Sequence, residues 1–129
     1  AERVSIAFVI VSHSAKLAEG VVELAQQMAK DVEFRAAGGT EDGGIGTSFD
    51  LIYAAVEELT GAGHQVVLLT DLGSADMTVE AVLEMVDPDQ VHWCPGPLVE
   101  GAVSAAVTAQ VGGDIEAVRE AAKAKEMFG

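Results

Sequence analysis

His13 is the residue with the clearest capacity for chemistry, because it follows directly on the apolar run 6–11 in the tripeptide Ser12-His13-Ser14. The run is rich in β-branched residues and predicts a buried parallel strand. A helix-like pattern starts at once, so the imidazole is expected beside the free N–H groups of a helix N-terminus. A nucleophilic nitrogen next to an anion site is typical of a histidine that carries a phosphoryl group. A histidine that merely caps a strand or helix is the alternative.

Asp71 is the candidate partner of His13. It ends the predicted strand 66–70, which in a doubly wound sheet commonly lies beside the first strand. A carboxylate that accepts a hydrogen bond from one ring nitrogen fixes the tautomer and stabilises the charged imidazole. The alternative for Asp71 is a helix cap or a turn residue.

A glycine-rich sequence that ends in Gly46-Thr47-Ser48 is the candidate anion cradle. Gly46 would let the backbone approach a phosphoryl group, and hydroxyl donors would come from Thr47, Ser48 and Ser14. Thr47 and Asp50 resemble a capping box. No lysine stands where a P-loop needs it, and the spacing is not G-x-G-x-x-G, so a nucleotide site is poorly supported. A mobile surface loop that ends in a helix cap is the alternative.

Apolar patterns of strand and helix type alternate along the whole chain. Strands are predicted at about 4–11, 32–36, 66–70 and 90–94, and helices at about 15–30, from 47 to Gly61, from Ser74 to Asp87, at 98–111 and after Asp114. In the first helix the spacing predicts one buried face, made by Leu17, Val21, Leu24, Ala25 and Met28. We therefore expect residues 1–129 to form a single α/β domain, with a doubly wound, mostly parallel four-stranded sheet and helices on both faces.

The right-handed crossover rule places all four strand-end loops at one edge of such a sheet. These loops, together with the helix starts that follow them, supply the residues that we expect to face protein partners: Gly73, Ser74, Met77, Pro97 and Glu100. Met77 and Phe49 are candidates for an apolar docking rim, although packing in the core is the more common role for such residues.

The composition excludes several function classes. Seven basic residues stand against twenty-one acidic ones, so the basic footprint of a nucleic-acid-binding protein is missing. The longest apolar run is far too short for a membrane span, and a single cysteine fits a reducing compartment, so we predict a cytoplasmic protein without membrane contact. One cysteine and three scattered histidines form no recognised metal-ligand spacing. We expect neither a metal site nor a cofactor.

Two rival uses of this fold do not match the residues. A response-regulator receiver needs an acidic cluster after its first strand, where this chain has Ser12-His13-Ser14. A histidine phosphatase needs arginines that clamp the phosphate, and no arginine lies in the predicted site loops. A carrier can borrow its positive groups from a protein partner, which also suits a strongly acidic surface.

With these residues in view, the chain resembles the mannose-type EIIA family of the phosphoenolpyruvate sugar phosphotransferase system, and within it the dihydroxyacetone kinase branch. The stretches that carry the resemblance are Val9 to Ser14 with Leu17 to Gly20, Gly43 to Ser48, Asp71 to Ala75, and Pro97 to Ala102. The last two stretches favour the dihydroxyacetone kinase branch over the sugar-transport branch.

The resemblance implies that His13 takes a phosphoryl group from phosphorylated HPr and passes it to ADP bound on the DhaL subunit, while DhaK supplies dihydroxyacetone. It also implies a homodimer. Two other functions stay open at this point: a sugar-transport EIIA phosphocarrier of the mannose family, and a non-catalytic regulatory module that senses an anion at the same site.

Overall fold

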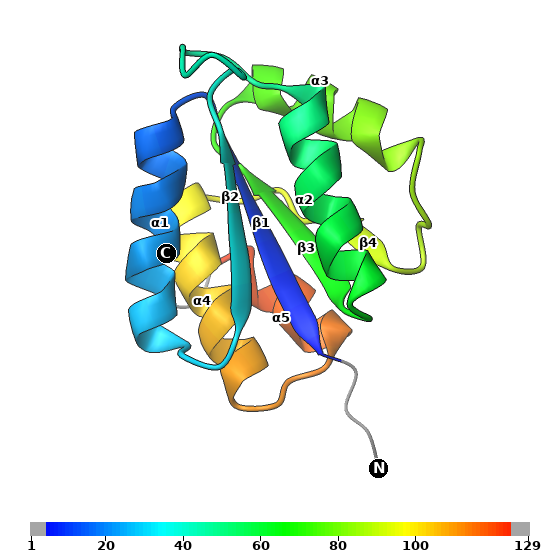
Figure 1. The fold of residues 1–129 in the computed structure, drawn as a ribbon. Helices are drawn as coiled ribbons and strands as arrows, with labels where there is room; N and C mark the ends of the chain where they lie inside the picture. The colour runs from blue at the N-terminus through cyan, green and yellow to red at the C-terminus, as the bar shows by residue number, and fades with distance from the viewer. Residues whose placement is uncertain (1–4, 125–129) are drawn as a thin grey trace.

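Strands and helices alternate along the chain, as the sequence pattern predicts. The computed structural model describes residues 5–124 (Figure 1), and its elements are β1 (Ile6–Ser12), α1 (Ala15–Met28), β2 (Glu33–Gly38), α2 (Phe49–Gly61), β3 (Gln65–Thr70), α3 (Gly73–Leu83), β4 (Val91–Trp93), α4 (Leu98–Gln110) and α5 (Ile115–Ala121). The predicted α/β class is confirmed.

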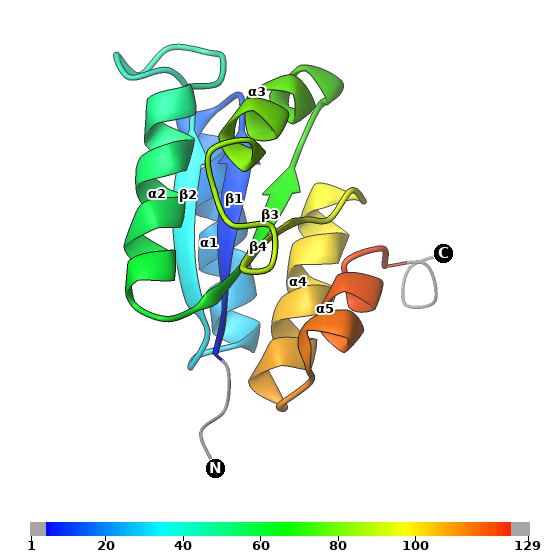
Figure 2. The ribbon, with the colours of Figure 1, turned by 90° about the vertical axis from the view of Figure 1, so that its right-hand side faces the viewer.

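The four strands form one sheet with the order β2-β1-β3-β4, and every pair is parallel. The helices α2 and α3 pack on one face of the sheet, and α1, α4 and α5 pack on the other. Figure 2 looks onto the first face, with α2 and α3 in front of the strands and α1 behind them. The predicted doubly wound arrangement is therefore confirmed, and its parallel character extends to the whole sheet.

The central strand β1 explains why its sequence is an unbroken apolar run. Phe8 and Ile10 pack into the core beneath α1, α4 and α5, whereas Val9 and Val11 pack beneath α2 and α3. All four side chains are fully buried. A strand that is covered on both faces has no solvent side for polar residues, and the alternation of an exposed sheet disappears.

The strand order creates a switch point at the carboxyl end of the sheet. From β1 the chain crosses through α1 to β2 on one side, and then through α2 to β3 on the opposite side of β1. The loops after β1 and β3 therefore leave the sheet toward opposite faces, and such a switch point is where open α/β sheets bind ligands. Those two loops carry His13 and Asp71.

The predicted buried face of α1 is partly wrong. Val21 and Ala25 are buried as expected, but Leu17, Leu24 and Met28 are 43%, 43% and 55% exposed. The inner row consists of small side chains because the start of α1 lies close against the end of β2: a Cβ added at Gly38 would come within 2.5 Å of the Ser14 carbonyl oxygen. The larger side chains are displaced to the outside.

The predicted start of α2 is also wrong in detail. Ser48 rather than Thr47 is the N-cap, and its Oγ accepts a hydrogen bond from the Leu51 backbone N at 3.2 Å. Within residues 5–124, Asp50 makes no hydrogen bond back to the cap, and Leu51 in the first turn is exposed. The cap lies one residue later because the Thr47 side chain bonds to α3 instead.

Other boundaries differ by a few residues. The strand β2 continues to Gly38 because that residue still pairs with Ser12 of β1. The helix α3 ends at Leu83, earlier than the proline signal at residue 88 predicts, and leaves Leu83 and Val86 only partly buried. The last helix begins after Asp114 as predicted, and Asp114 caps it by accepting from the Ala117 backbone N at 2.9 Å.

We predict that Gly38→Ala destabilises the protein by about 1–3 kcal/mol, the usual cost of forcing a methyl group into a filled site. The added Cβ would meet the backbone of Ser14 and Ala15 and the side chain of Ala18 within 3 Å. Urea denaturation measures the effect. Gly61→Ala is the matched control, because its Cβ would have no neighbour within 4 Å. Equal stability of the two variants would contradict the close approach of α1 and β2.

Candidate functional site

The carboxylate of Asp71 connects the ends of β1 and β3. Its Oδ1 accepts from the Leu72 backbone N at 2.7 Å and lies 2.9 Å from Nδ1 of His13. Its Oδ2 accepts from the Ser12 hydroxyl at 2.8 Å and from the His13 backbone N at 3.0 Å. Both oxygens are therefore occupied, and the side chain of Asp71 is the hub of the site.

These contacts keep Asp71 ionised. Burial on its own would raise the pKa of the carboxyl group, but the hydrogen bonds from His13, Ser12 and Leu72 outweigh burial and lower that pKa below its ordinary value. The resulting stabilisation is fully present above the ordinary aspartate pKa of about 3.9, and it is lost as the pH falls through the lower pKa of the folded state.

An ionised carboxylate can only accept hydrogen bonds, so Nδ1 of His13 must carry the proton. The other ring nitrogen, Nε2, then holds the lone pair in the neutral imidazole. The side chains of His13 and Asp71 are 18% and 10% exposed. The site is thus partly sheltered, and its geometry selects Nε2 as the nucleophile.

Ser74 lies at the nucleophilic nitrogen rather than simply at the surface facing partners. Its Oγ is 2.5 Å from Nε2 of His13, so in the resting site the hydroxyl donates to the lone pair. Ser74 belongs to the first turn of α3, and the N-cap residue Leu72 makes no side-chain capping bond. Nε2 therefore lies at a helix N-terminus whose dipole favours negative charge.

Gly46 holds the glycine-rich loop onto the site. Its backbone N donates to the His13 carbonyl oxygen at 2.8 Å, and its φ of +143° is a conformation that favours glycine. A Cβ at this position would lie 3.0 Å from the side chain of Thr40. The N–H of Gly46 is thus engaged with His13, and this contact positions the loop against the site.

The three predicted hydroxyl donors differ in how far they are engaged. Ser48 caps α2 and also donates to Glu41 at 3.3 Å, so it has little capacity left for a phosphoryl group. Ser14 caps α1 through its oxygen, which leaves its proton available. Thr47 Oγ1 lies 2.7 Å from Thr78 Oγ1 of α3. If Thr78 is the donor in that pair, the proton of Thr47 is free to point into the site.

Of the residues predicted to face partners, those on α3 lie beside the site. Gly73 is exposed, and Met77 is 74% exposed, so the core-packing alternative for Met77 is wrong. Two further apolar side chains that the sequence did not single out, Leu72 and Ile45, are exposed on the adjoining loops. Phe49 instead stacks against Tyr53 and is partly buried.

Pro97 and Glu100 are exposed at the start of α4, and within residues 5–124 they make no hydrogen bond to the His13 cluster. The register explains the separation. β4 ends at Trp93, which pairs with Leu68 of β3. The chain therefore leaves the sheet before it reaches the height of Asp71, which follows the end of β3. Crossover handedness predicts the edge of the sheet at which a loop lies, but not the level at which the strand stops.

Sequence reasoning missed two hydrogen bonds between elements that support the site, one made by Ser12 and one made by Thr78. Ser12 is fully buried and supports Asp71, and Thr78 connects α3 to the glycine-rich loop. A signal for Thr78 was present, because Ser74 and Thr78 are four residues apart and therefore lie on the same face of a helix.

The described residues contain no other obvious centre for phosphoryl chemistry. No group of three or more His, Cys, Asp or Glu that could hold a metal occurs among residues 5–124, and no helix in this range is long and apolar enough to cross a membrane. The other two histidines are bonded elsewhere, His64 to Ser5 and His92 to Gln65.

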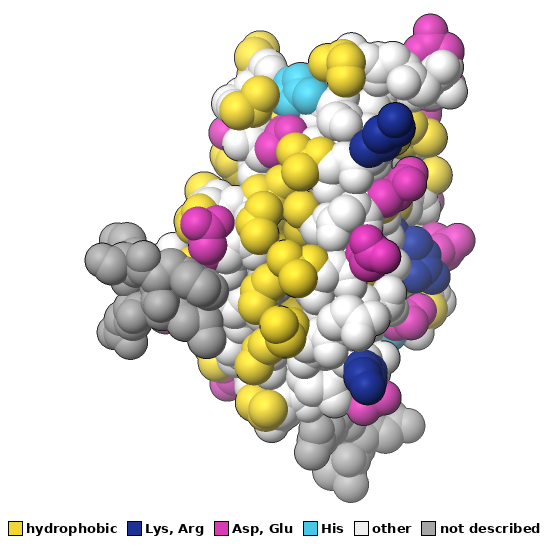
Figure 3. Space-filling view, turned by 90° about the vertical axis from the view of Figure 1, so that its left-hand side faces the viewer, with side chains coloured by type: hydrophobic (Ala, Val, Ile, Leu, Met, Phe, Trp, Pro, Cys, Tyr) yellow, Lys and Arg dark blue, Asp and Glu magenta, His cyan; other side chains and the backbone are white. Residues whose placement is uncertain are grey.

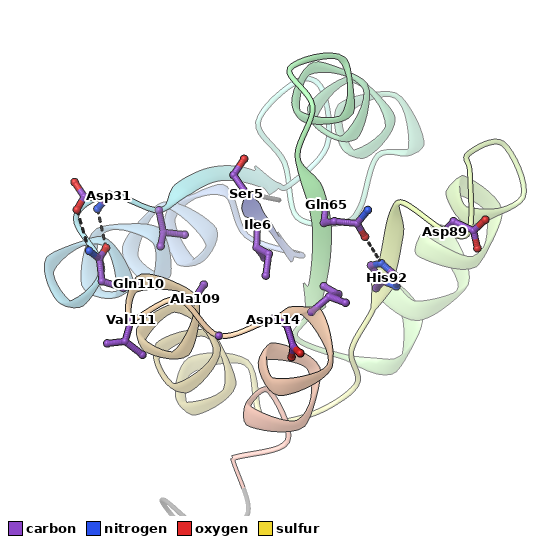
Figure 4. Close-up of a pocket in the computed structure, with 14 residues that line it drawn as sticks. Ser5, Ile6, Asp31, Gln65, Asp89, His92, Ala109, Gln110, Val111 and Asp114 are labelled. Atoms are coloured by element: carbon purple, nitrogen blue, oxygen red, sulfur yellow. Dashed lines mark hydrogen bonds between the residues drawn. The ribbon is translucent and has the colours of Figure 1, made fainter. Parts of the chain in front are cut away.

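A cavity of about 800 Å³ lies at the opposite end of the sheet, where the strands begin. Figure 4 shows Asp31 and Gln110 on one wall, with the bonded pair Gln65 and His92 on another. Burial lowers the pKa of His92. Because this ring is uncharged at neutral pH and the lining includes Asp89 and Asp114, the cavity is poorly suited to a phosphoryl group.

Comparison with known proteins matches the chain to one family and to named relatives. The family model EIIA-man, described as "PTS system fructose IIA component", matches residues 7–119. The phosphotransferase subunit DhaM of a PTS-dependent dihydroxyacetone kinase from Lactococcus lactis is 40% identical over 112 residues, covering 87% of this chain and 89% of the relative. The phosphoryl donor subunit DhaM from Escherichia coli is 41% identical over 117 residues, which cover 85% of this chain but only 25% of that protein.

Solved structures support the same fold. A protein of unknown function, EF1359, superimposes with a TM-score of 0.85 at 29% identity, covering 93% of this chain and 94% of that one. The mannose/sorbose-specific IIA subunit from Enterococcus faecalis gives a TM-score of 0.58 at 22% identity, covering 92% and 84%. At that level of identity the second likeness concerns the fold alone.

We predict that Asp71→Asn shifts the tautomer of His13. The amide nitrogen cannot accept a hydrogen bond, so either the ring or the backbone N of His13 loses its acceptor, and the proton is no longer held on Nδ1. Long-range ¹⁵N–¹H NMR spectra of the imidazole report which nitrogen is protonated. The wild type should show Nδ1–H, and the variant a mixture or Nε2–H. If both the wild type and the variant show only Nδ1–H, Asp71 does not orient the His13 ring.

Proposed function

Because the chain belongs to the EIIA-man family of phosphotransferase-system proteins, we propose that it is a phosphohistidine carrier, the phosphoryl donor subunit of a phosphoenolpyruvate-dependent dihydroxyacetone kinase. The observation that carries the proposal is the state of the His13 ring. Nδ1 is held by the ionised Asp71, and Nε2 is presented at the N-terminus of α3 beside the Ser74 hydroxyl.

The transfer step follows from these contacts. The lone pair of Nε2 attacks the phosphorus of phosphorylated HPr, a bond between nitrogen and phosphorus forms, and the bond between phosphorus and the donor breaks with its electron pair returning to HPr. The ring keeps its proton on Nδ1 and gains positive character, which the carboxylate of Asp71 stabilises. The Ser74 hydroxyl turns from Nε2 to a phosphoryl oxygen.

The onward step needs a partner with positive charge. Within residues 5–124 no Lys or Arg takes part in the hydrogen bonds of the His13 cluster, so the cluster lacks the cations that stabilise phosphoryl transfer to a small molecule. We propose that ADP bound on DhaL accepts the phosphoryl group, while DhaK supplies dihydroxyacetone. The exposed apolar side chains of Ile45, Leu72 and Met77 provide a rim on which such partners can dock.

The proposal concerns the carrier domain. The chain spans about nine-tenths of the Lactococcus relative and a quarter of the Escherichia coli relative, so activities of the longer protein are not carried over as a whole. We further propose that the carrier acts in the cytoplasm, where phosphorylated HPr is made, and that it works as a homodimer.

We predict that His13→Ala abolishes phosphorylation and leaves the fold intact. The protein is mixed with enzyme I, HPr and phosphoenolpyruvate, and acid-labile, base-stable phosphate is measured on it. Loss of one partly exposed imidazole should cost little stability. His64→Ala and His92→Ala are the matched controls and should still be phosphorylated. Phosphate uptake by the His13 variant would disprove the assignment of the carrier residue.

The same assay separates the alternative functions. Addition of DhaK, DhaL, ADP and dihydroxyacetone should discharge the phosphorylated protein and form dihydroxyacetone phosphate. Discharge only to a sugar-transport component would assign the chain to the mannose branch. A protein that binds inorganic phosphate but takes no phosphoryl group from HPr would be a regulatory module that senses an anion.

We predict that Thr47→Val slows transfer from HPr by about a hundredfold, the usual effect of removing one donor aimed at developing charge. Since Ser48 caps α2, the substitution should leave the helix cap intact. Stopped-flow or quench-flow measurement of the transfer rate tests this, with Thr78→Val as the companion variant, which keeps Thr47 and removes only its support. An unchanged rate in the Thr47 variant would exclude its hydroxyl from the site.

A further inference from the structure

The start of α3 lacks the side-chain cap that holds the other two helices at the site. Ser14 caps α1 and Ser48 caps α2 through hydrogen bonds with backbone N–H groups. The helix α1 also rests on a buried inner row, and Figure 3 shows the apolar stripe that remains on its outer face. In α3 the N-cap residue Leu72 makes no side-chain bond, and Ala75 is the one buried residue of the first turn. The position of this turn therefore depends on another contact.

A hydrogen bond from the end of β3 takes the place of the cap. Thr70, the last residue of β3, donates from its Oγ1 to Oδ1 of Asp76 at 2.7 Å. The same Oγ1 lies 3.4 Å from Nε1 of Trp93, and since an indole N–H can only donate, the hydroxyl accepts there and gives its own proton to Asp76. Thr70 is 8% exposed, so this bond lies beneath the surface.

The bond closes a short segment that carries both partners of the imidazole. Between Thr70 and Asp76 lie Asp71, which is 2.9 Å from Nδ1 of His13, and Ser74, which is 2.5 Å from Nε2. The segment is therefore tied to itself on either side of the two contacts. Its closure sets where the second contact lies relative to the first.

The two partners of the imidazole differ in how they are held. Asp71 is fixed independently, because its Oδ2 accepts from the Ser12 hydroxyl and from a backbone N of the same loop. Ser74 is exposed, and within residues 5–124 its side chain bonds to the ring alone. Gly73 before it is also exposed, with no neighbour for a Cβ within 4 Å. The place of the Ser74 hydroxyl thus follows from the backbone of the first turn, which Asp76 anchors.

We propose that Thr70 and Asp76 are positioning residues for phosphoryl transfer, whose hydrogen bond holds the first turn of α3 so that the Ser74 hydroxyl meets Nε2 of His13. The proposal rests on the carrier function put forward above and adds two residues that do not touch the phosphoryl group. A donor that is already in place needs no rearrangement as charge develops on the phosphoryl oxygens. A displacement of about 1 Å at such a donor can slow a reaction about a hundredfold.

Thr70→Val tests the donor of this bond, because valine keeps the shape of the side chain and deletes the hydroxyl. The maximal rate of transfer from HPr in quench-flow should fall about tenfold or more. The HPr concentration at half-saturation should stay the same, since so buried a side chain cannot contact HPr. Thr70→Ser keeps the hydroxyl and should restore most of the rate. A wild-type rate in the valine variant, or a serine variant as slow as valine, would overturn the proposal.

Thr108→Val is the matched control for the loss of a threonine hydroxyl. Thr108 is partly buried on α4, where its Oγ1 donates to the Ser104 carbonyl oxygen at 2.9 Å. This variant should lose a comparable hydrogen bond and still transfer at the wild-type rate. If it slows transfer as much as Thr70→Val, the effect is a general one on the fold, and the specific role of Thr70 is lost.

Asp76 provides the second test, because its oxygen can be kept while its charge is removed. Asp76→Asn still offers Oδ1 as an acceptor to Thr70 and should transfer close to the wild-type rate, whereas Asp76→Ala should be as slow as Thr70→Val. The double variant Thr70→Val/Asp76→Ala should be no slower than either single variant, since both remove the same bond. An asparagine variant as slow as the alanine variant would show that charge matters instead and would contradict the proposal.

A double-mutant cycle shows whether Thr70 acts through Ser74. Ser74→Ala should slow transfer by itself, and adding Thr70→Val to it should change the rate by less than about twofold, because the donor that Thr70 positions is already gone. If the two effects multiply instead, Thr70 acts on transfer by another route and is not a positioning residue for Ser74.

The ¹⁵N resonance of Nε2 tests the same contact in the unphosphorylated protein. With the imidazole neutral, Thr70→Val and Ser74→Ala should both move this resonance in the direction of a lone pair without a hydrogen bond, and Thr108→Val should leave it in place. An unmoved resonance in Thr70→Val would overturn the positioning role. Because no phosphoryl donor is present, this result is independent of whether the chain is a carrier, and failure of the two proposals is distinguishable.

Discussion

The carboxylate of Asp71 is the contact on which both the structure and the chemistry of the site depend. It accepts hydrogen bonds from the buried hydroxyl of Ser12 and from the backbone N of His13, and so joins the end of β1 to the turn after β3. Leaving such buried donors without an acceptor would cost about 1–3 kcal/mol each. The same group fixes the proton of the imidazole on Nδ1 and thereby makes Nε2 the reactive atom.

The sequence was sufficient to predict how distant loops meet, because alternation of strands and helices leaves few topologies. His13 and Asp71 lie 58 residues apart, and their contact follows from β1 and β3 being neighbours at the switch point of a parallel sheet. Details that depend on side-chain direction were less predictable. Ser74 was expected to face a partner, yet its hydroxyl lies against the histidine ring.

Packing against particular neighbours explains the predictions that were wrong. The apolar spacing of α1 fits two faces, and the close approach of β2 at Gly38 selects the face with small residues and leaves Leu17, Leu24 and Met28 outside. Likewise, Thr47 and Ser48 are both able to cap α2, and the bond from Thr47 to Thr78 decides between them. Spacing along the chain does not contain this tertiary information.

The central claim is that the phosphoryl group resides on one particular nitrogen of one histidine. The most direct measurement is the ¹⁵N and ³¹P NMR spectrum of the ¹⁵N-labelled protein after phosphorylation by enzyme I, HPr and phosphoenolpyruvate. The account predicts a single phosphohistidine at His13, with phosphorus coupled to Nε2 and the proton kept on Nδ1 beside Asp71. Phosphorus on Nδ1, or on either of the other two histidines, would contradict it.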